Sequence, residues 1–193
     1  MIANKWKKLF FLLLGINAII IILLFVLINL PNGDEKYFTT NLEQDNYAPL
    51  KIQTDKKNLN QIINHYLDKE GLTGSFDYKI ILDEEVELYG SIPVFSKSVQ
   101  LKLTFAPIAL ENGDIVLEQK SISVGQLQLP VSYVLKLIND LYQLPKWVLI
   151  QPSEEKIYVS LQSMNIKSDI KVKVDEFNLK DDDIRFTLMV PVK

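Results

Sequence analysis

The sequence predicts an α+β protein in which an N-terminal transmembrane helix precedes a curved, mostly antiparallel sheet packed on two amphipathic helices. Three observations lead to this class. The run from Leu9 to Leu30 contains no charged residue. The segments 58–71 and 130–142 have apolar residues at helical spacing, and the segments between and after them alternate apolar with polar residues. Runs of strands separated by single helices favour helices packed against one antiparallel sheet.

The uncharged run is long enough to cross a bilayer. At about 1.5 Å per residue, a helix of this length spans roughly 33 Å. Lys5, Lys7 and Lys8 precede the run with no acidic residue among them, and two acidic residues follow it closely. Because positive charge stays on the cytoplasmic side, we expect a cytoplasmic N-terminus and an extracytoplasmic C-terminal part. The predicted location is the cell membrane, with a single pass.

A cleaved signal peptide is the competing interpretation of this segment. The apolar run exceeds the 7–15 residues of a signal-peptide core, and residues 27–33 lack an A-x-A-like cleavage site. A lipoprotein is excluded because the chain has no cysteine. We therefore predict a cytoplasmic basic tip and transmembrane signal anchor over 1–30, a stalk over 31–57, and an extracytoplasmic α+β domain over 58–193.

The charge of the exterior part limits its partners. The first 30 residues hold three of the 21 basic residues and none of the 24 acidic ones, which leaves a net charge of −6 beyond them. Nucleic acid is excluded as a partner because its phosphates require clustered Lys and Arg. Without cysteine no disulfide can form, so a packed core must supply the stability.

The segment 58–71 is the first helix expected in the exterior domain. Asn58 is the expected N-cap, and Gln61 stands three residues later, as in a capping box. Gly71 is the expected C-terminal stop. The apolar residues that share one face at helical spacing are Leu59, Ile62, Ile63, Tyr66 and Leu67.

Strands are expected wherever apolar and polar residues alternate. The clearest run is 99–105, and such half-buried alternation is typical of antiparallel sheets. The Asn112-Gly113 pair predicts a tight hairpin with positive φ at both residues. The remaining expected elements are strands over 76–82, 86–92, 115–124, 157–161, 172–179 and 184–190, the helix 130–142, and a turn at Asp181-Asp182-Asp183.

Few residues point to catalysis. The chain has one histidine, His65, on the polar flank of the first exterior helix, which leaves too few ligands for a zinc site. G-x-S-x-G and P-loop strings are both missing from the sequence. A pair of carboxylates that the fold brings together, as in a glycosidase, is left open. We expect no enzyme activity, no catalytic residue and no cofactor.

Two acidic runs could in principle bind calcium, which takes several oxygen ligands. They are Asp83-Glu84-Glu85 and Asp181-Asp182-Asp183. Neither matches the D-x-D-x-D-G pattern of a calcium loop, and adjacent carboxylates between strands are usually solvated turns. We therefore expect no metal site.

Two blocks of sequence carry a family resemblance. The first is 90–125, and the second is 123–161, which contains a characteristic set of residues. That set is Gly125, Leu129, Pro130, Tyr133, Leu135, Pro145, Trp147 and Pro152. Over most of its length the chain resembles the YpmS-like family of uncharacterised membrane-anchored proteins from Gram-positive bacteria. The resemblance implies an N-terminal transmembrane helix, an exterior domain and no catalytic motif. In element order the chain is also similar to bacterial tubular lipid-binding-like domains, which supports a lipid ligand by analogy.

The leading hypothesis is that the exterior domain binds a lipid or lipid-linked cell-envelope component. A curved apolar sheet closed by amphipathic helices can hold an apolar ligand, although the same residues can simply fill a core. The candidate wall of such a site consists of Leu101, Leu103, Phe105, Leu135, Ile138, Phe186 and Leu188.

Two other functions stay open. One is a scaffold that recruits an extracytoplasmic envelope enzyme or other envelope protein, and the other is a hydrolase of unfamiliar type. A lipid container predicts a continuous apolar cavity, whereas a scaffold predicts a filled core with an exposed apolar patch. A hydrolase predicts converging carboxylates or a Ser-His contact in a cleft.

Overall fold

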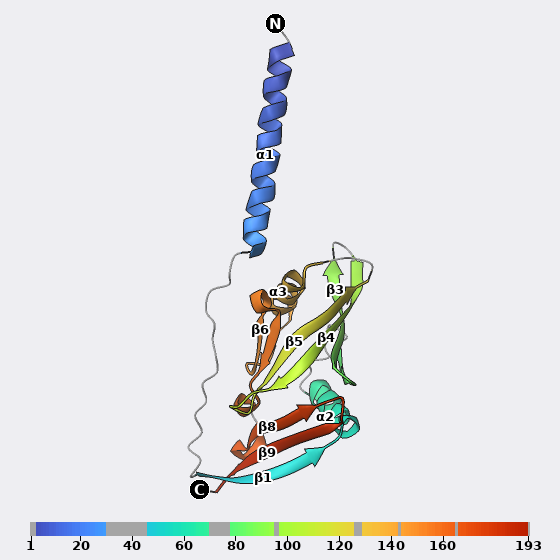
Figure 1. Ribbon diagram of the computed structural model, residues 1–193, viewed down its shortest axis with the longest axis vertical. Coiled ribbons are helices and arrows are strands. Elements are labelled where there is room, and N and C mark those ends of the chain that lie inside the picture. Colours follow the sequence, from blue (N-terminus) through green and yellow to red (C-terminus); the bar gives the residue numbers. More distant parts are fainter. Residues whose placement is uncertain are drawn as a thin grey trace. The chain divides into compact units, whose positions relative to one another are not determined.

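The structure, a computed structural model, describes residues 3–29, 46–69, 78–94, 97–125, 129–142, 144–164 and 166–192. The chain divides into two units, Met1–Glu35 and Lys36–Lys193. Helix α1 lies in the first unit, and the described strands and remaining helices lie in the second (Figure 1).

Helix α1 spans Ala3–Asn29. Its described side chains from Phe10 to Leu23 are exposed, and nearly all of them are apolar. Asn17 is polar, and its Nδ2 donates a hydrogen bond to the carbonyl oxygen of Leu13 at 3.0 Å, which satisfies the amide within the helix. In the part of the chain that the structure describes, no helix meets the length and hydropathy required of a membrane span. The transmembrane assignment stays a prediction.

The second unit contains two antiparallel sheets, which confirms the α+β class and the antiparallel pairing (Figure 1). The larger sheet has the strand order β2-β3-β4-β5-β7-β6, and the smaller has the order β1-β9-β8. The strands are β1 (Tyr47–Thr54), β2 (Lys79–Leu82), β3 (Val86–Val94), β4 (Lys97–Ala109), β5 (Ile115–Val124), β6 (Val148–Gln151), β7 (Lys156–Val159), β8 (Lys171–Asn178) and β9 (Asp183–Pro191). The helices are α2 (Lys56–Lys69) and α3 (Val131–Leu141), with short 3₁₀ turns η2 (Pro152–Glu154), η3 (Leu161–Ser163) and η4 (Lys167–Asp169).

The division into two sheets differs from the single curved sheet that the sequence predicts. Alternation identifies strands but does not say which strands pair. β1 and β6 are additional strands, and β1 lies within the range 31–57 that the sequence analysis assigns to a stalk. Pro49 lies inside β1, and proline within a run argues against a strand unless the strand is an edge. β1 is such an edge, and the segment 31–57 as a whole shows no sustained period from which a strand could be predicted.

Helix α2 begins earlier than predicted because Asp55 is its cap. The Asp55 carboxylate accepts a hydrogen bond from the backbone N–H of Asn58, with Oδ1 and N 2.7 Å apart. Asn58 therefore lies inside the first turn, and its prediction as N-cap is wrong. Both residues can cap a helix, so the sequence pattern alone did not separate them. Gly71, the predicted stop, lies outside the described residues.

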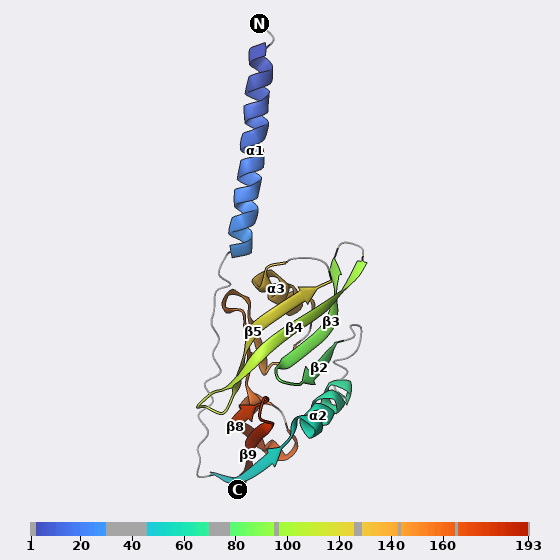
Figure 2. The same cartoon turned by 45° about the vertical axis from the view of Figure 1, so that its right-hand side comes forward.

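Asn60 on α2 covers the edge of the larger sheet. Its Nδ2 donates to the carbonyl oxygen of Leu82 and its Oδ1 accepts from the N–H of Leu82, both at 2.8 Å. The side-chain amide thus takes the place of a neighbouring strand beside β2. Figure 2 shows α2 next to β2 at this side of the larger sheet. Covering an edge in this way prevents pairing with other chains.

The hairpin between β4 and β5 closes through a three-residue loop. Gly113 N–H donates to Leu110 C=O at 2.8 Å, and Leu110 N–H donates to Asp114 C=O at 2.9 Å. Gly113 has φ +90°, but Asn112 is not among the residues with positive φ. The prediction of a hairpin is confirmed, whereas positive φ at Asn112 is wrong. A three-residue loop needs a left-handed conformation only at its last residue.

A buried carboxylate organises the polar groups around this loop. Asp114 is 1% exposed, and its Oδ2 accepts hydrogen bonds from the hydroxyl of Tyr158 at 2.5 Å and from Nδ2 of Asn112 at 3.1 Å. Gln162 donates from Nε2 to the carbonyl oxygen of Asn112 at 2.5 Å. A buried charge requires such donors, because leaving it unpaired is costly. The loop, β7 and η3 are therefore held together around Asp114.

The same loop joins the two sheets. The carbonyl oxygen of Gly113 accepts a hydrogen bond from the N–H of Val174 on the edge strand β8 at 2.9 Å. A Cβ at position 113 would lie 2.7 Å from the Cβ of Lys173, so the close approach requires glycine. The hairpin loop thus covers the outer edge of β8.

Titration of Tyr158 should reveal the Asp114 cluster in solution. Burial, followed by the hydrogen bond to Asp114, raises the pKa of Tyr158 to about 12. An unfolded tyrosine has a pKa near 10, so the stabilisation is complete below about pH 10 and is lost as the pH rises towards about 12. We expect the difference in free energy of unfolding between the parent chain and Tyr158→Phe, measured by urea titration, to shrink over this range. A difference that does not change with pH would contradict the arrangement.

Candidate functional site

The predicted apolar wall lies almost entirely inside the core of the second unit. Leu103 is 0% exposed and Phe105 is 1% exposed. Six of the seven predicted residues belong to one buried hydrophobic cluster, and they are Leu101, Leu103, Phe105, Leu135, Ile138 and Phe186. The structure therefore brings β4, α3 and β9 together as the sequence analysis expects. In this arrangement the six side chains pack against other core residues, as in an ordinary hydrophobic core.

Leu188, the seventh predicted residue, lies on a different surface. It is half-buried, and it stands opposite Leu50 on β1 and Val172 on β8. Residues in register share a face of a sheet, and every second residue of a strand returns to that face. The surface defined in this way, called the aliphatic face below, consists of Ala48, Leu50, Ile52, Val172, Leu188, Val190 and Val192.

Much of the aliphatic face is open to solvent. Leu50 is 55% exposed, Ile52 is 39% exposed and Val192 is 58% exposed. The face continues into the core, because Ile52 stands opposite Phe186, and Phe186 stands opposite the buried Val174. Along these strands a single apolar face is therefore buried at one end and uncovered at the other. Large exposed apolar patches on soluble domains are typical of interaction sites.

The edge of the smaller sheet next to this face is open but protected. Val192 N–H donates to Asn46 C=O at 3.1 Å, so the even-numbered residues of β1 turn their main-chain groups towards β9 and the odd-numbered residues turn theirs outward. Pro49 and Lys51 are two of these outward residues. Pro49 has no N–H to donate, and the side chain of Lys51 is charged. Proline and lysine at such positions discourage the addition of a further strand.

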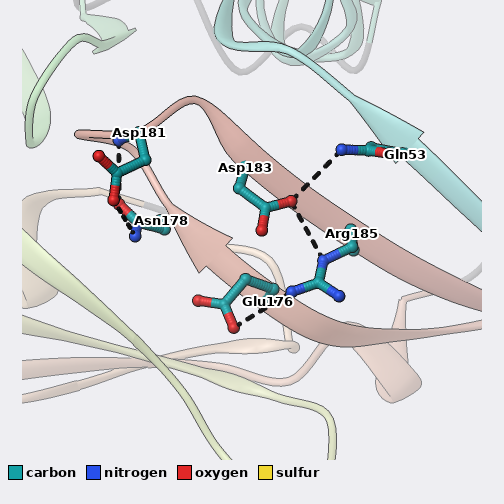
Figure 3. Close-up of polar contacts among 6 residues, drawn as sticks. All are labelled: Gln53, Glu176, Asn178, Asp181, Asp183 and Arg185. Carbon is teal, nitrogen blue, oxygen red and sulfur yellow. Dashed lines mark hydrogen bonds and ion pairs between the residues drawn. The ribbon is translucent and has the colours of Figure 1, made fainter.

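The opposite face of the smaller sheet carries charged side chains around Arg185 (Figure 3), whereas Thr187 and Met189 on the same face are buried. Arg185 contacts Asp183 at 3.1 Å and Glu176 at 3.6 Å, and Gln53 donates to the Asp183 carboxylate at 3.4 Å. These groups are largely exposed, so the ion pairs contribute little stability. The two faces differ in charge, because exposed ionic side chains lie on this face and the aliphatic face carries none.

The acidic runs and the histidine occupy separate places. Asp181 accepts from Asn178 Nδ2 at 2.8 Å within the turn before β9 (Figure 3). Asp182 accepts from the N–H of Lys56 at 2.7 Å, so it helps to hold the start of α2. His65 is exposed on α2. Among the described residues, no group of three or more His, Asp or Glu side chains is placed to hold a metal ion.

The aliphatic face can bind apolar groups but offers no chemistry for a reaction. Its seven members are aliphatic and uncharged, so contact with an apolar partner buries no ionic group. The sequence contained a pattern that could have identified this surface. Ala48, Leu50 and Ile52 alternate with Pro49, Lys51 and Gln53, although they lie in the segment that is predicted to be a stalk. The topology-setting residues Lys5, Lys7 and Lys8 lie in the first turns of α1, and the Lys7 side chain is exposed.

Comparisons with known proteins agree with the resemblance. The family described as "Uncharacterized protein conserved in bacteria (DUF2140)" matches residues 4–190. The "Uncharacterized protein YpmS" of Bacillus subtilis (strain 168) is 34% identical over 188 residues, which is 97% of this chain and 98% of that protein. No solved structure matches the chain. The resemblance to the YpmS-like family is confirmed.

Two alanine substitutions should separate the core from the aliphatic face. Phe105→Ala removes a fully buried ring and should lower the free energy of unfolding by about 3–5 kcal/mol. Leu50→Ala shortens an exposed side chain and should change it by no more than about 1 kcal/mol. Urea unfolding of the two variants measures both effects. A loss at Leu50 as large as that at Phe105 would show that the aliphatic face is packed.

Proposed function

The chain belongs to the DUF2140 family, whose description names no activity, and from its residues we propose a single-pass membrane protein whose exterior α+β domain binds a lipid or lipid-linked cell-envelope component. The aliphatic face, rather than a cavity in the core, is the proposed binding surface. The observation that carries this proposal is the exposure of uncharged aliphatic side chains beside an otherwise buried apolar cluster.

The proposed anchor is α1. The run from Leu9 to Leu30 has no charge, and the described side chains of α1 between Phe10 and Leu23 are exposed and, except for Asn17, not polar. Exposed apolar side chains all round a helix are unfavourable in water and suit a lipid environment. Lys5, Lys7 and Lys8 favour a cytoplasmic N-terminus and hence an extracytoplasmic domain.

Binding is proposed in place of catalysis. The exposed surface that stands out among the described residues is the aliphatic face, and the single histidine lies exposed on α2. A lipid tail needs no hydrogen-bonding partner, so it is matched by a face of aliphatic side chains. Tethering to the same membrane would keep such a ligand at high effective concentration, so weak intrinsic affinity would suffice.

A scaffold for an extracytoplasmic envelope protein is the second candidate. The observation in its favour is that a buried apolar cluster coexists with an exposed apolar face, which is the combination expected of a scaffold. Pro49 and Lys51 limit the forms this can take, because they discourage a partner strand along β1. A protein partner would have to lie across the face.

Protease treatment of intact protoplasts tests the proposed topology. Protease added outside should digest the exterior domain and leave α1 protected in the membrane, because the domain is proposed to lie outside. An epitope placed before Met1 should resist digestion until the protoplasts are lysed, which is the internal control. A soluble, secreted chain that begins near Pro31 would overturn the anchor.

A charge on the aliphatic face tests the proposed ligand. We expect Leu50→Asp in the fragment 36–193 to reduce co-purifying lipid, measured by mass spectrometry, by about tenfold, because a buried carboxylate costs well over 1.4 kcal/mol. Ile108→Asp is the matched control, since Ile108 is also exposed but lies on β4 of the larger sheet. Equal lipid content in the two variants, or none in the parent fragment, would contradict lipid binding at this face.

A further inference from the structure

We propose that the aliphatic face rests on the outer leaflet of the same membrane that holds α1, so that the bilayer itself covers Leu50, Ile52 and Val192. This inference rests on the proposed anchor and names the source of the lipid. It makes the smaller sheet a membrane-contacting surface.

The smaller sheet has the amphipathic character that such a contact requires. Leu50 and Ile52 alternate along β1 with Lys51 and Gln53, which lie on the opposite face. On that opposite face Arg185 is paired with acidic side chains (Figure 3). A surface with an uncharged aliphatic side and a charged side lies in the interface of a bilayer for the same reason as an amphipathic helix does. Apolar area enters the lipid, and the charges stay in water.

The position of the face along the chain also favours the membrane. Sixteen residues, 30–45, separate the end of α1 from Asn46, and a chain of that length reaches at most about 56 Å. Ala48, the first member of the aliphatic face, lies two residues after Asn46. The N–H of Val192, another member, donates a hydrogen bond to the carbonyl oxygen of Asn46. The aliphatic face therefore starts where the tether ends. In the proposed arrangement the membrane that holds α1 is therefore within reach of this face.

Pairing with a second copy along β1 fits less well. Antiparallel pairing of two β1 edges centred on Lys51 would set two like charges opposite each other, which is destabilising. Pro49 would leave an acceptor of the other chain without a donor. Lipid chains avoid both the like-charge contact and the unpaired acceptor, because they cover the face without using the hydrogen-bonding groups of the edge.

The absence of cysteine from the sequence allows a direct test. Single-cysteine variants of the full chain, Leu50→Cys and Val192→Cys, are labelled with an environment-sensitive fluorophore and reconstituted in vesicles of phosphatidylethanolamine and phosphatidylglycerol. Each is measured with and without a spin-labelled lipid that quenches on contact. Glu84→Cys, at an exposed bend between β2 and β3, is the control.

The expected result is specific to the face. Because an interfacial apolar surface lies about 5–10 Å into the headgroup region, the probes at Leu50→Cys and Val192→Cys should shift to the blue and lose about half of their emission. The probe at Glu84→Cys should do neither. Adding Leu50→Glu to the Val192→Cys chain should reduce quenching at position 192, whereas Ile108→Glu, on the larger sheet, should not.

Four results would overturn the inference. Unquenched probes on chains that float with the vesicles would show that the face does not touch the bilayer, while the proposed anchor would stand. A blue shift without lipid quenching, together with energy transfer between labelled copies, would show that a second copy covers the face. Equal quenching at Glu84→Cys would indicate general collapse onto the membrane. Chains that fail to float would refute the proposed anchor itself, and this inference with it.

Discussion

The buried carboxylate of Asp114 is the constraint on which the arrangement of the two sheets depends. Its donors come from the loop itself and from Tyr158 on β7, so the hairpin cannot move without leaving a charge unpaired in the interior. Fixing the loop also fixes Gly113, whose carbonyl oxygen receives the N–H of Val174. The edge of the smaller sheet is thereby attached to the tip of the larger sheet's longest hairpin.

The attachment at β8 determines which part of the smaller sheet's apolar face is buried in the core and which part stays exposed. Val174 and Phe186 are drawn into the common core, where Phe186 and Phe177 pack edge to face with centroids 6.1 Å apart. The strands continue beyond this core, and the same face then carries Leu50 and Leu188 outward. The exposed aliphatic surface is thus a continuation of the core past the point where the larger sheet covers it.

The sequence predicted elements well and their association poorly. Alternation over 99–105 in β4 and helical spacing over α3 were sufficient, because each pattern continues without a break. β1 was missed because the segment 31–57 as a whole shows no sustained period, although residues 48–53 within it alternate. Six of the seven predicted wall residues lie in the buried cluster and Leu188 does not, since period two assigns a face but not the extent to which another element covers it. The role of Asp114 depends on Tyr158, 44 residues away, and no local pattern reveals that contact.

The protection of β1 differs between its edge and its face, and this difference limits what can cover it. Pro49 and Lys51 remove or guard hydrogen-bonding groups at the edge, whereas nothing polar interrupts Ala48, Leu50 and Ile52 on the face. A partner strand would have to form hydrogen bonds along the edge, where Pro49 and Lys51 discourage pairing. A surface that binds only through apolar contact does not use the edge, so these two residues do not oppose it. Lipid tails have this property, because they bury aliphatic area without hydrogen bonds, and each exposed side chain of the face adds to that contact in proportion to its area. The chemistry of β1 therefore favours a lipid surface over an added strand.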